Sequence, residues 1–168
     1  LESKSKLGKL DILINCAGTV DFGSIENFPL SKFEKIMNLN VKSVFSCIQE
    51  AIKIMKSNGD EGKIITIGSI ASKWTGRGGD GSYSASKYAV YGMIESIARQ
   101  LHGSGSNIAV GLICPGVVDT TLTNPGKDEK PNWIRPSTIA DSVLHMVTAP
   151  KNVNIFDLTI FGMDEKPW

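Results

Sequence analysis

The sequence predicts an α/β fold in which a mostly parallel sheet is covered by helices on both faces. Short apolar runs, each bounded by glycine, proline or polar residues, alternate with longer segments in which apolar residues recur at helical spacing. Most residues of the short runs are apolar, which is typical of strands buried on both faces of a parallel sheet. Strands separated by helices imply right-handed crossovers, so helices are expected on both sides of the sheet.

Four apolar runs predict the strands. Ala17 and Gly18 close the first run, which we expect to be buried on both faces. β-Branched residues dominate the second run, and Pro115 with Gly116 stops the third. In chain order, the expected strands are residues 10–16 (LDILINC), 63–68 (KIITIG), 107–114 (NIAVGLIC) and 154–159.

Three segments between these runs predict helices. Apolar residues from Phe33 to Met55 recur every three or four positions, and glycines at 103 and 105 end the second helical segment. The polar, proline-bearing segment 121–136 is predicted to be a mobile loop or lid. The expected helices are a stretch at about 29–57, a helix at about 82–101 and a helix at 137–147.

Composition limits the class of protein. The 168 residues suit one domain, and 18 basic residues against 17 acidic ones give no electrostatic case for binding nucleic acid or an anionic membrane. The longest apolar stretch, 108–118, is too short to span a bilayer. Cys16, Cys47 and Cys114 lack metal-type spacing and are predicted to be buried free thiols in a reducing compartment. We therefore expect a cytoplasmic protein without a metal site.

Polar residues follow the predicted strands at positions that share one edge of the sheet. Ligands of parallel α/β sheets bind outside the carboxyl ends of the strands. Asn15 ends the first strand, Ser69 follows the second, and the segment 115–120 follows the third. Tyr83 and Lys87 lie on the helix entered soon after Ser69. The sequence therefore predicts a ligand site at this edge.

Tyr83 and Lys87 stand four residues apart, so on a helix they lie on one face as neighbours. A protonated amine beside a phenol favours the phenolate and lowers a pKa that is ordinarily near 10. A phenol with such a pKa can donate or accept a proton at working pH. This pair is the predicted acid–base centre.

With these motifs in order, the chain resembles a short-chain dehydrogenase/reductase, from the fourth strand of that family's fold to its C-terminus. The resemblance implies a partial Rossmann-like, three-layer α/β/α fold that holds the last four strands. The segments that carry it are Asn15-Cys16-Ala17-Gly18, Asn40 in Asn38-Leu39-Asn40-Val41, Ser69 in Ile67-Gly68-Ser69, Tyr83 with Lys87, and Pro115-Gly116-Val117-Val118-Asp119-Thr120, which is similar to the family's Pro-Gly-x-Val-x-Thr turn.

The resemblance implies an NAD(P)-dependent oxidoreductase that acts on a small carbonyl compound or secondary alcohol. Tyr83 would be the acid or base, Ser69 would orient the substrate oxygen, and Lys87 would bind the nicotinamide ribose. Asn40 would hold a water that links Lys87 to solvent. The tail at 149–160 resembles NADP-preferring reductases of small hydroxy acids, which slightly favours NADP over NAD. The implied cofactor-binding residues are Asn15, Ala17, Gly18, Tyr83, Lys87, Pro115, Gly116, Val118 and Thr120.

Several candidates keep a structural alternative. Asn38 competes with Asn40, and Asn15 is better suited to structural support than to direct binding. Trp74 and Trp133 would either line a substrate pocket or cover the core. Cys16 and Cys114 are interpreted as small packing residues, and His102 and His145 as structural histidines.

The family's phosphate-binding glycine motif has no counterpart in the sequence. The glycine-rich run 76–81 precedes the catalytic helix, which is the wrong place for that role. We expect a fragment that lacks the first three strands and leaves an apolar strand on an open edge, so that the isolated chain would be unstable or inactive. The alternative function is a noncatalytic Rossmann-like binding or interaction protein.

Oligomer contacts are also implied by the resemblance. The helices that carry Asn40 and Tyr83 form the subunit contact in many relatives, so a homodimer or homotetramer is expected. Val90 and Ile94 would either face outward at such a contact or face the sheet.

Overall fold

Four parallel strands form the sheet in the computed structural model, which describes residues 8–75, 80–123 and 131–165. Their order across the sheet follows the chain, β1-β2-β3-β4, as the crossovers between them imply. The α/β fold with a parallel sheet is confirmed. The strands are β1 (Ile12–Asn15), β2 (Glu61–Ile67), β3 (Asn107–Pro115) and β4 (Asp157–Ile160).

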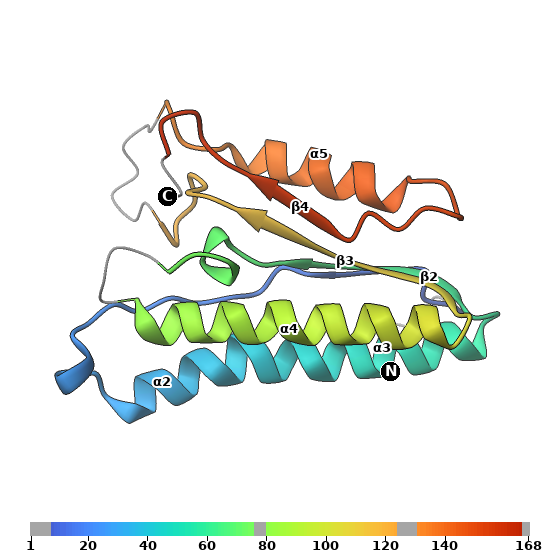
Figure 1. The fold of residues 1–168 in the computed structure, drawn as a ribbon, viewed down its shortest axis with the longest axis horizontal. Helices are drawn as coiled ribbons and strands as arrows, with labels where there is room; N and C mark the ends of the chain where they lie inside the picture. Colours follow the sequence, from blue (N-terminus) through green and yellow to red (C-terminus); the bar gives the residue numbers. More distant parts are fainter. Residues whose placement is uncertain (1–7, 76–79, 124–130, 166–168) are drawn as a thin grey trace.

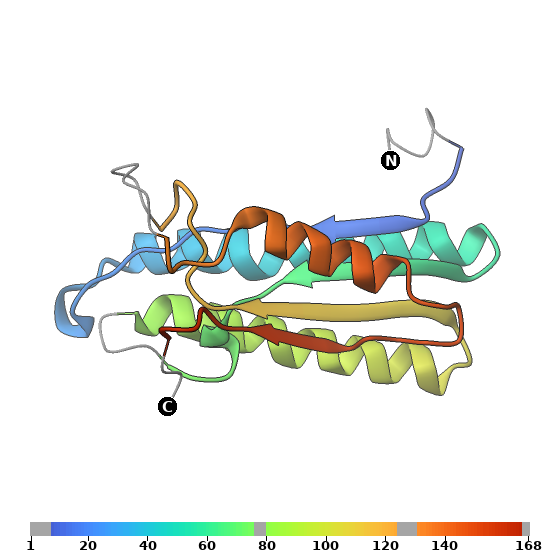
Figure 2. The same cartoon turned by 90° about the horizontal axis from the view of Figure 1, so that it is seen from above.

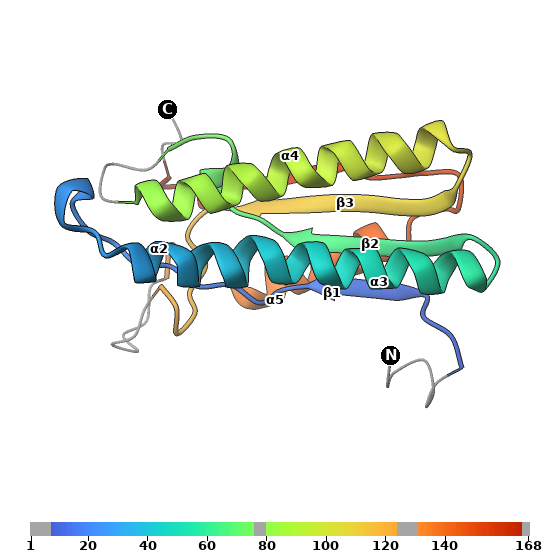
Figure 3. The ribbon, with the colours of Figure 1, turned by 90° about the horizontal axis from the view of Figure 1, so that it is seen from below.

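Helices cover both faces of this sheet, which gives three layers (Figure 1). Viewed from above, α5 (Pro136–Val147) lies over one face (Figure 2). Viewed from below, the long helices lie side by side across the other face (Figure 3). No helix of the described residues has the length and apolar character needed to cross a membrane. The helices of the second face are α2 (Leu30–Met37), α3 (Ser43–Ser57) and α4 (Gly81–Gly103).

The predicted helical stretch at about 29–57 forms, but it is divided. Helices α2 and α3 are joined without a break by the π-helical segment η2 (Asn38–Lys42). A π-helical turn widens the helix locally, and such turns are frequent at functional sites. Asn40 lies within this segment and is buried.

Among the described residues, two apolar clusters form the core, one on each side of the sheet. The larger lies between the sheet and helices α3 and α4, and the smaller lies beneath α5. Val90 and Ile94 of α4 belong to the larger cluster and are at most 1% exposed. The alternative that these two residues face the sheet is therefore correct, and they form no outward contact.

We expected strand β1 to be buried on both faces because its sequence is apolar, but one of its faces is exposed. Ile12 and Ile14 are 44% and 37% exposed, whereas Leu13 on the opposite face packs on the larger cluster. Helix α5 packs mainly on β2 and β3, which leaves this face of β1 partly exposed. Among the described residues β1 pairs only with β2, so it is an edge strand, as expected.

Two of the three cysteines also differ from the prediction. Cys114 is buried in β3, but Cys16 and Cys47 are exposed. The apolar neighbours of Cys47, Val44 and Ile48, face the core from α3. Position 47 lies at the flank of the buried stripe formed by Val44, Ile48, Ala51 and Met55, and there its side chain is exposed. An apolar sequence neighbourhood therefore did not imply burial.

Candidate active site

A cleft of about 460 Å³ opens at the carboxyl edge of the sheet, where the sequence placed its candidates. It is bounded by the loop after β1, the end of β2, the start of α4, the turn after β3 and the start of α5. Predicted residues that line it are Ala17, Gly18, Ser69, Tyr83, Lys87, Pro115, Gly116, Val118 and Thr120.

A second, larger hollow of about 1170 Å³ lies between residues 23–33 and the start of α4. It contains none of the predicted catalytic or cofactor-binding residues. Size alone would favour this hollow, but the convergence of ionisable and hydrogen-bonding side chains favours the cleft at the sheet edge.

Ser69 and Tyr83 meet in the cleft although they come from different elements. Ser69 follows β2 by two residues and caps the short 3-10 helix η3 (Ile70–Ser72), where its hydroxyl accepts the Ala71 N–H at 3.1 Å. Tyr83 stands in the first turn of α4, and its side chain is hydrogen-bonded with Ser69. The predicted proximity of the serine and the phenol is therefore present.

The pKa of Tyr83 moves in the direction opposite to our expectation. Burial of the phenol raises its pKa, the hydrogen bond with Ser69 lowers it, and the charge of Asp80 raises it further. The Lys87 Nζ lies over the phenol ring, 5.6 Å from the ring centre. Desolvation of the phenolate therefore decides the direction of the pKa shift, and the phenol is protonated at neutral pH.

Lys87 is buried in the wall of the cleft with only 7% of its surface exposed. Its Nζ donates a hydrogen bond to the Ile67 carbonyl at 3.2 Å. Burial lowers the pKa of Lys87 to about 8, because the charged ammonium loses its hydration. The amine is thus largely charged at pH 7. It lies close to Gly18: a Cβ built on this glycine would be 3.8 Å from the Lys87 Nζ.

Asn40 ties the loop after β1 to helix α4. Its Oδ1 accepts the Thr19 N–H at 2.8 Å, and its Nδ2 donates to the Thr19 carbonyl at 2.9 Å and to Ser86 Oγ at 3.0 Å. Asn38 is exposed, so Asn40 is the buried member of the pair. These contacts position Thr19, a cleft residue that the sequence analysis missed.

Asn15 lies behind the cleft and does not line it. Its Nδ2 donates to Thr66 Oγ1 at 3.1 Å across the β1–β2 pair, and the side chain is buried. This geometry agrees with the interpretation of Asn15 as structural support for the strand.

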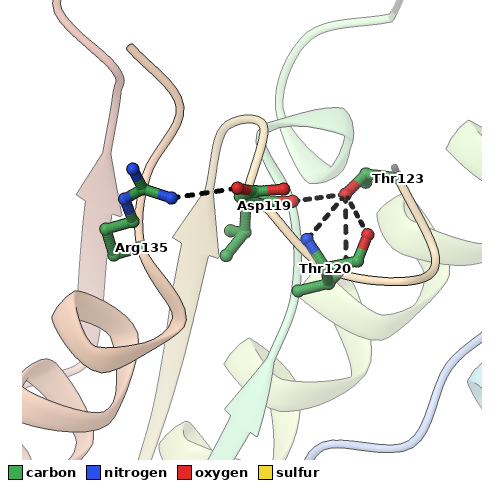
Figure 4. A network of polar contacts seen from close by, with 5 residues as sticks. Asp119, Thr120, Thr123 and Arg135 are labelled. Carbon is green, nitrogen blue, oxygen red and sulfur yellow. Dashed lines mark hydrogen bonds and ion pairs between the residues drawn. The ribbon is translucent and has the colours of Figure 1, made fainter. Parts of the chain in front are cut away.

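The turn after β3 forms the opposite wall. The Gly116 N–H donates to the Ile160 carbonyl of β4 at 2.8 Å, and Val118 forms a bridge with Ile134. Figure 4 shows that Arg135 reaches Asp119, at 3.0 Å, while Thr123 contacts Thr120. The turn is therefore held by segments that follow it in the chain.

Other residues of the cleft were not predicted as site residues, although Cys16, Ile67 and Gly68 stand in motifs quoted above. Polar or apolar residues of these types are common in loops, and only the folded chain brings them to one place. Cys16 belongs to this group: it was interpreted as a packing residue, but it is exposed at the cleft. The unpredicted lining residues are Cys16, Thr19, Ile67, Gly68, Leu122, Thr123, Pro136 and Ile139.

The two tryptophans are not part of this wall, whereas Leu122, Thr123 and Pro136 of the predicted lid do line the cleft. Trp74 packs against Phe161 with ring centres 5.6 Å apart, and neither Trp74 nor Trp133 lines the cleft. Residues 124–130 of the predicted lid lie outside the described residues. Within the described part of the chain, no group of three or more His, Cys, Asp or Glu side chains is arranged to hold a metal ion.

Comparison with known proteins gives one family. Residues 2–131 match the model of the short chain dehydrogenase family. A 3alpha-hydroxysteroid dehydrogenase of Mediterraneibacter gnavus is 41% identical over 119 residues, which cover 71% of this chain and 46% of that protein. The chain thus spans about half the length of that curated relative.

Solved structures agree with this match. A doubly substituted mutant of a Serratia marcescens short-chain dehydrogenase/reductase superposes with a TM-score of 0.83 at 31% identity, covering 96% of this chain and 68% of that one. The closed form of a serine dehydrogenase complexed with NADP+ superposes with a TM-score of 0.81 at 28% identity, covering 90% and 64%. Both structures share the arrangement of elements described above.

Proposed function

Because the chain belongs to the short-chain dehydrogenase/reductase family, we propose that residues 1–168 form the Rossmann-like catalytic portion of an NAD(P)-dependent oxidoreductase. The reaction is hydride transfer between a nicotinamide and a carbonyl or secondary alcohol. The observation that carries the proposal is the convergence of Ser69, Tyr83 and Lys87 in one cleft at the carboxyl edge of the sheet. Chance surface residues would not be expected to converge in this way.

Three residues of the chain have separate roles in the transfer of the proton. The nicotinamide, when bound, supplies the hydride. Tyr83 donates a proton to the oxygen that becomes an alkoxide, and its raised pKa keeps this proton in place at neutral pH. Ser69 donates its single hydroxyl hydrogen to the same substrate oxygen and so orients it. The Lys87 ammonium provides positive charge over the face of the phenol ring.

The cleft suits a nicotinamide nucleotide in shape and chemistry. The missing side chain of Gly18 leaves space beside Lys87 Nζ for a ribose, whose hydroxyls would accept from the amine. Pro115, Gly116, Val118 and Thr120 would hold the carboxamide from the opposite wall, and Ala17 would flank the ribose. Asn15 would support the strand from behind, and Asn40, which holds Thr19, would also hold a water that links Lys87 to solvent. NADP is slightly favoured over NAD, in line with the NADP+ complex of the serine dehydrogenase relative.

The proposed setting is a cytoplasmic homodimer or homotetramer acting on a small molecule. A subunit contact through α3 and α4 would use the exposed side of these helices, on which Phe45 and Tyr88 are 48% and 44% exposed. Val90 and Ile94 take no part, because they are buried against the sheet.

The test is Tyr83→Phe in the full-length protein, with Tyr88→Phe on the same helix as the matched control. Loss of an acid–base group slows chemistry by about 10²–10⁴-fold. We expect this loss of turnover for Tyr83→Phe, with NADPH binding, followed by nicotinamide fluorescence, unchanged. Tyr88, whose hydroxyl donates to the Lys73 carbonyl outside the cleft, should tolerate the change.

Two results would contradict the proposal. Full turnover of Tyr83→Phe would remove the phenol from the chemistry. A wild-type protein that binds neither NADH nor NADPH would instead favour the alternative, a noncatalytic Rossmann-like binding protein.

A further inference from the structure

The turn that forms one wall of the cleft is held by a residue near the end of the described chain. Glu165 Oε1 accepts the Val117 N–H at 2.7 Å, and its Oε2 accepts the Gly162 N–H at 2.6 Å. The carboxylate is partly buried and joins two backbone segments that are 45 positions apart in the sequence. Hydrogen bonds from N–H groups to an ionised carboxylate are short and about twice as strong as neutral ones.

Gly116 makes this contact possible. A Cβ at position 116 would lie 2.0 Å from Glu165 Oε2 and 2.5 Å from Oε1, far inside van der Waals contact. The carboxylate therefore occupies the space that any other residue would fill with its side chain. The glycine of the Pro115-Gly116 turn thus matters through this close approach and not through its backbone angles, because a larger residue there would displace the Glu165 carboxylate.

The hydrogen bonds of the turn show which group remains for a ligand. The Val117 carbonyl and the Asp119 N–H bond to Ile134, at 3.1 and 2.9 Å. In an extended segment, the polar groups of successive residues point to opposite sides. The N–H of Val118 therefore points away from Ile134, and Val118 lines the cleft. Because Glu165 accepts the Val117 N–H and Ile134 donates to the Val117 carbonyl, both backbone polar groups of Val117 are hydrogen-bonded.

From this geometry we propose that Glu165 is a positioning residue for the nicotinamide-binding turn. By holding Val117 and filling the space at Gly116, it orients the Val118 N–H toward the carboxamide of the cofactor. The inference rests on the proposed function, because it assigns the occupant of the cleft as a nicotinamide. It adds a requirement for an acceptor-only side chain at 165, since a carboxylate accepts from both N–H groups and an amide can accept with only one end.

The test separates the nicotinamide end of the cofactor from its adenosine end. The full-length protein and its Glu165→Ala and Glu165→Gln variants are titrated with NADPH and with 2′-phospho-ADP-ribose, which lacks the nicotinamide. Asp164→Ala, which removes the neighbouring exposed carboxylate, is the matched control. We expect Glu165→Ala to raise the Kd for NADPH about tenfold and to leave the Kd for 2′-phospho-ADP-ribose within twofold of wild type. Glu165→Gln should fall between, and Asp164→Ala should match wild type.

Several outcomes overturn the inference. One is an unchanged NADPH affinity in Glu165→Ala; another is an equal loss for both ligands, which would mean a general structural role. If Glu165→Ala does not fold, Glu165→Gln decides by the same comparison. If wild-type protein binds NADPH no more tightly than 2′-phospho-ADP-ribose, the inference is overturned but the proposed function is not. Wild-type protein that binds neither ligand, nor NADH, overturns the proposed function together with it.

Discussion

Replacing Asn40 with alanine tests how the loop after β1 is held at the cleft. The Asn40 side chain is 2% exposed and makes three hydrogen bonds, two with the backbone of Thr19 and one with Ser86 Oγ. Alanine would leave the Thr19 N–H and carbonyl without these partners. Ser86 would keep its own bond, because its hydroxyl also donates to the Tyr83 carbonyl at 2.7 Å.

The magnitude follows from these contacts. Each of the two orphaned Thr19 groups costs about 1–3 kcal/mol, at the lower end because Thr19 is partly exposed and can be rehydrated. The buried space left by the amide adds to this cost, and the better helix propensity of alanine returns about 0.6 kcal/mol. We therefore expect Asn40→Ala to lower the free energy of unfolding by about 2–4 kcal/mol, through lost hydrogen bonds.

Thermal unfolding followed by circular dichroism measures this loss. For a chain of this size, 2–4 kcal/mol corresponds to a decrease in Tm of about 5–15 °C. Asn38→Ala is the matched control, because Asn38 lies two positions away in the same π-helical segment and is exposed. It should change the free energy of unfolding by less than about 0.5 kcal/mol. If the Asn40→Ala variant has the same Tm as the Asn38→Ala control, the reasoning is refuted.

Two further predictions concern the burial of Lys87 and of a strand glycine. Because the folded pKa of Lys87 is about 8 and its ordinary value is 10.5, the unfolded chain binds more protons between these pH values and wild-type stability rises with pH there. In urea titrations, Lys87→Met should therefore be more stable than wild type below pH 8. This advantage should shrink by about 3 kcal/mol as the pH rises to 10.5. A stability difference that stays constant with pH would contradict the free-energy cost of burying the charged ammonium. Gly111→Ala should destabilise by about 2 kcal/mol or more, since its Cβ would lie 2.5 Å from both the Ile155 carbonyl oxygen and Met146 Cε. Gly92→Ala in α4, with no atom within 4 Å of its Cβ, should stabilise by about 1 kcal/mol, and similar melting of the two alanine variants would be inconsistent with the packing at β3.

Local pattern was sufficient for the elements and for much of the cleft. Periodicity separated strands from helices, and their alternation implied a parallel sheet whose carboxyl edge collects the site. The spacing of Tyr83 and Lys87 put them on one face of α4, and Pro115-Gly116 ended β3 beside them. These features depend on neighbours within a few residues, which is the range that a sequence pattern describes.

Long-range contact decided the rest. Burial of the Tyr83 phenol reversed the expected direction of its pKa shift, and the phase of α3 turned Cys47 outward from apolar neighbours. Asn40 rather than Asn38 became the buried asparagine because it faces Thr19 and Ser86. The Glu165 carboxylate meets the Val117 N–H across 48 positions of the chain, a contact that no periodicity or turn signal encodes. Desolvation and hydrogen bonding between distant segments depend on how the layers pack, so only the tertiary structure could determine them.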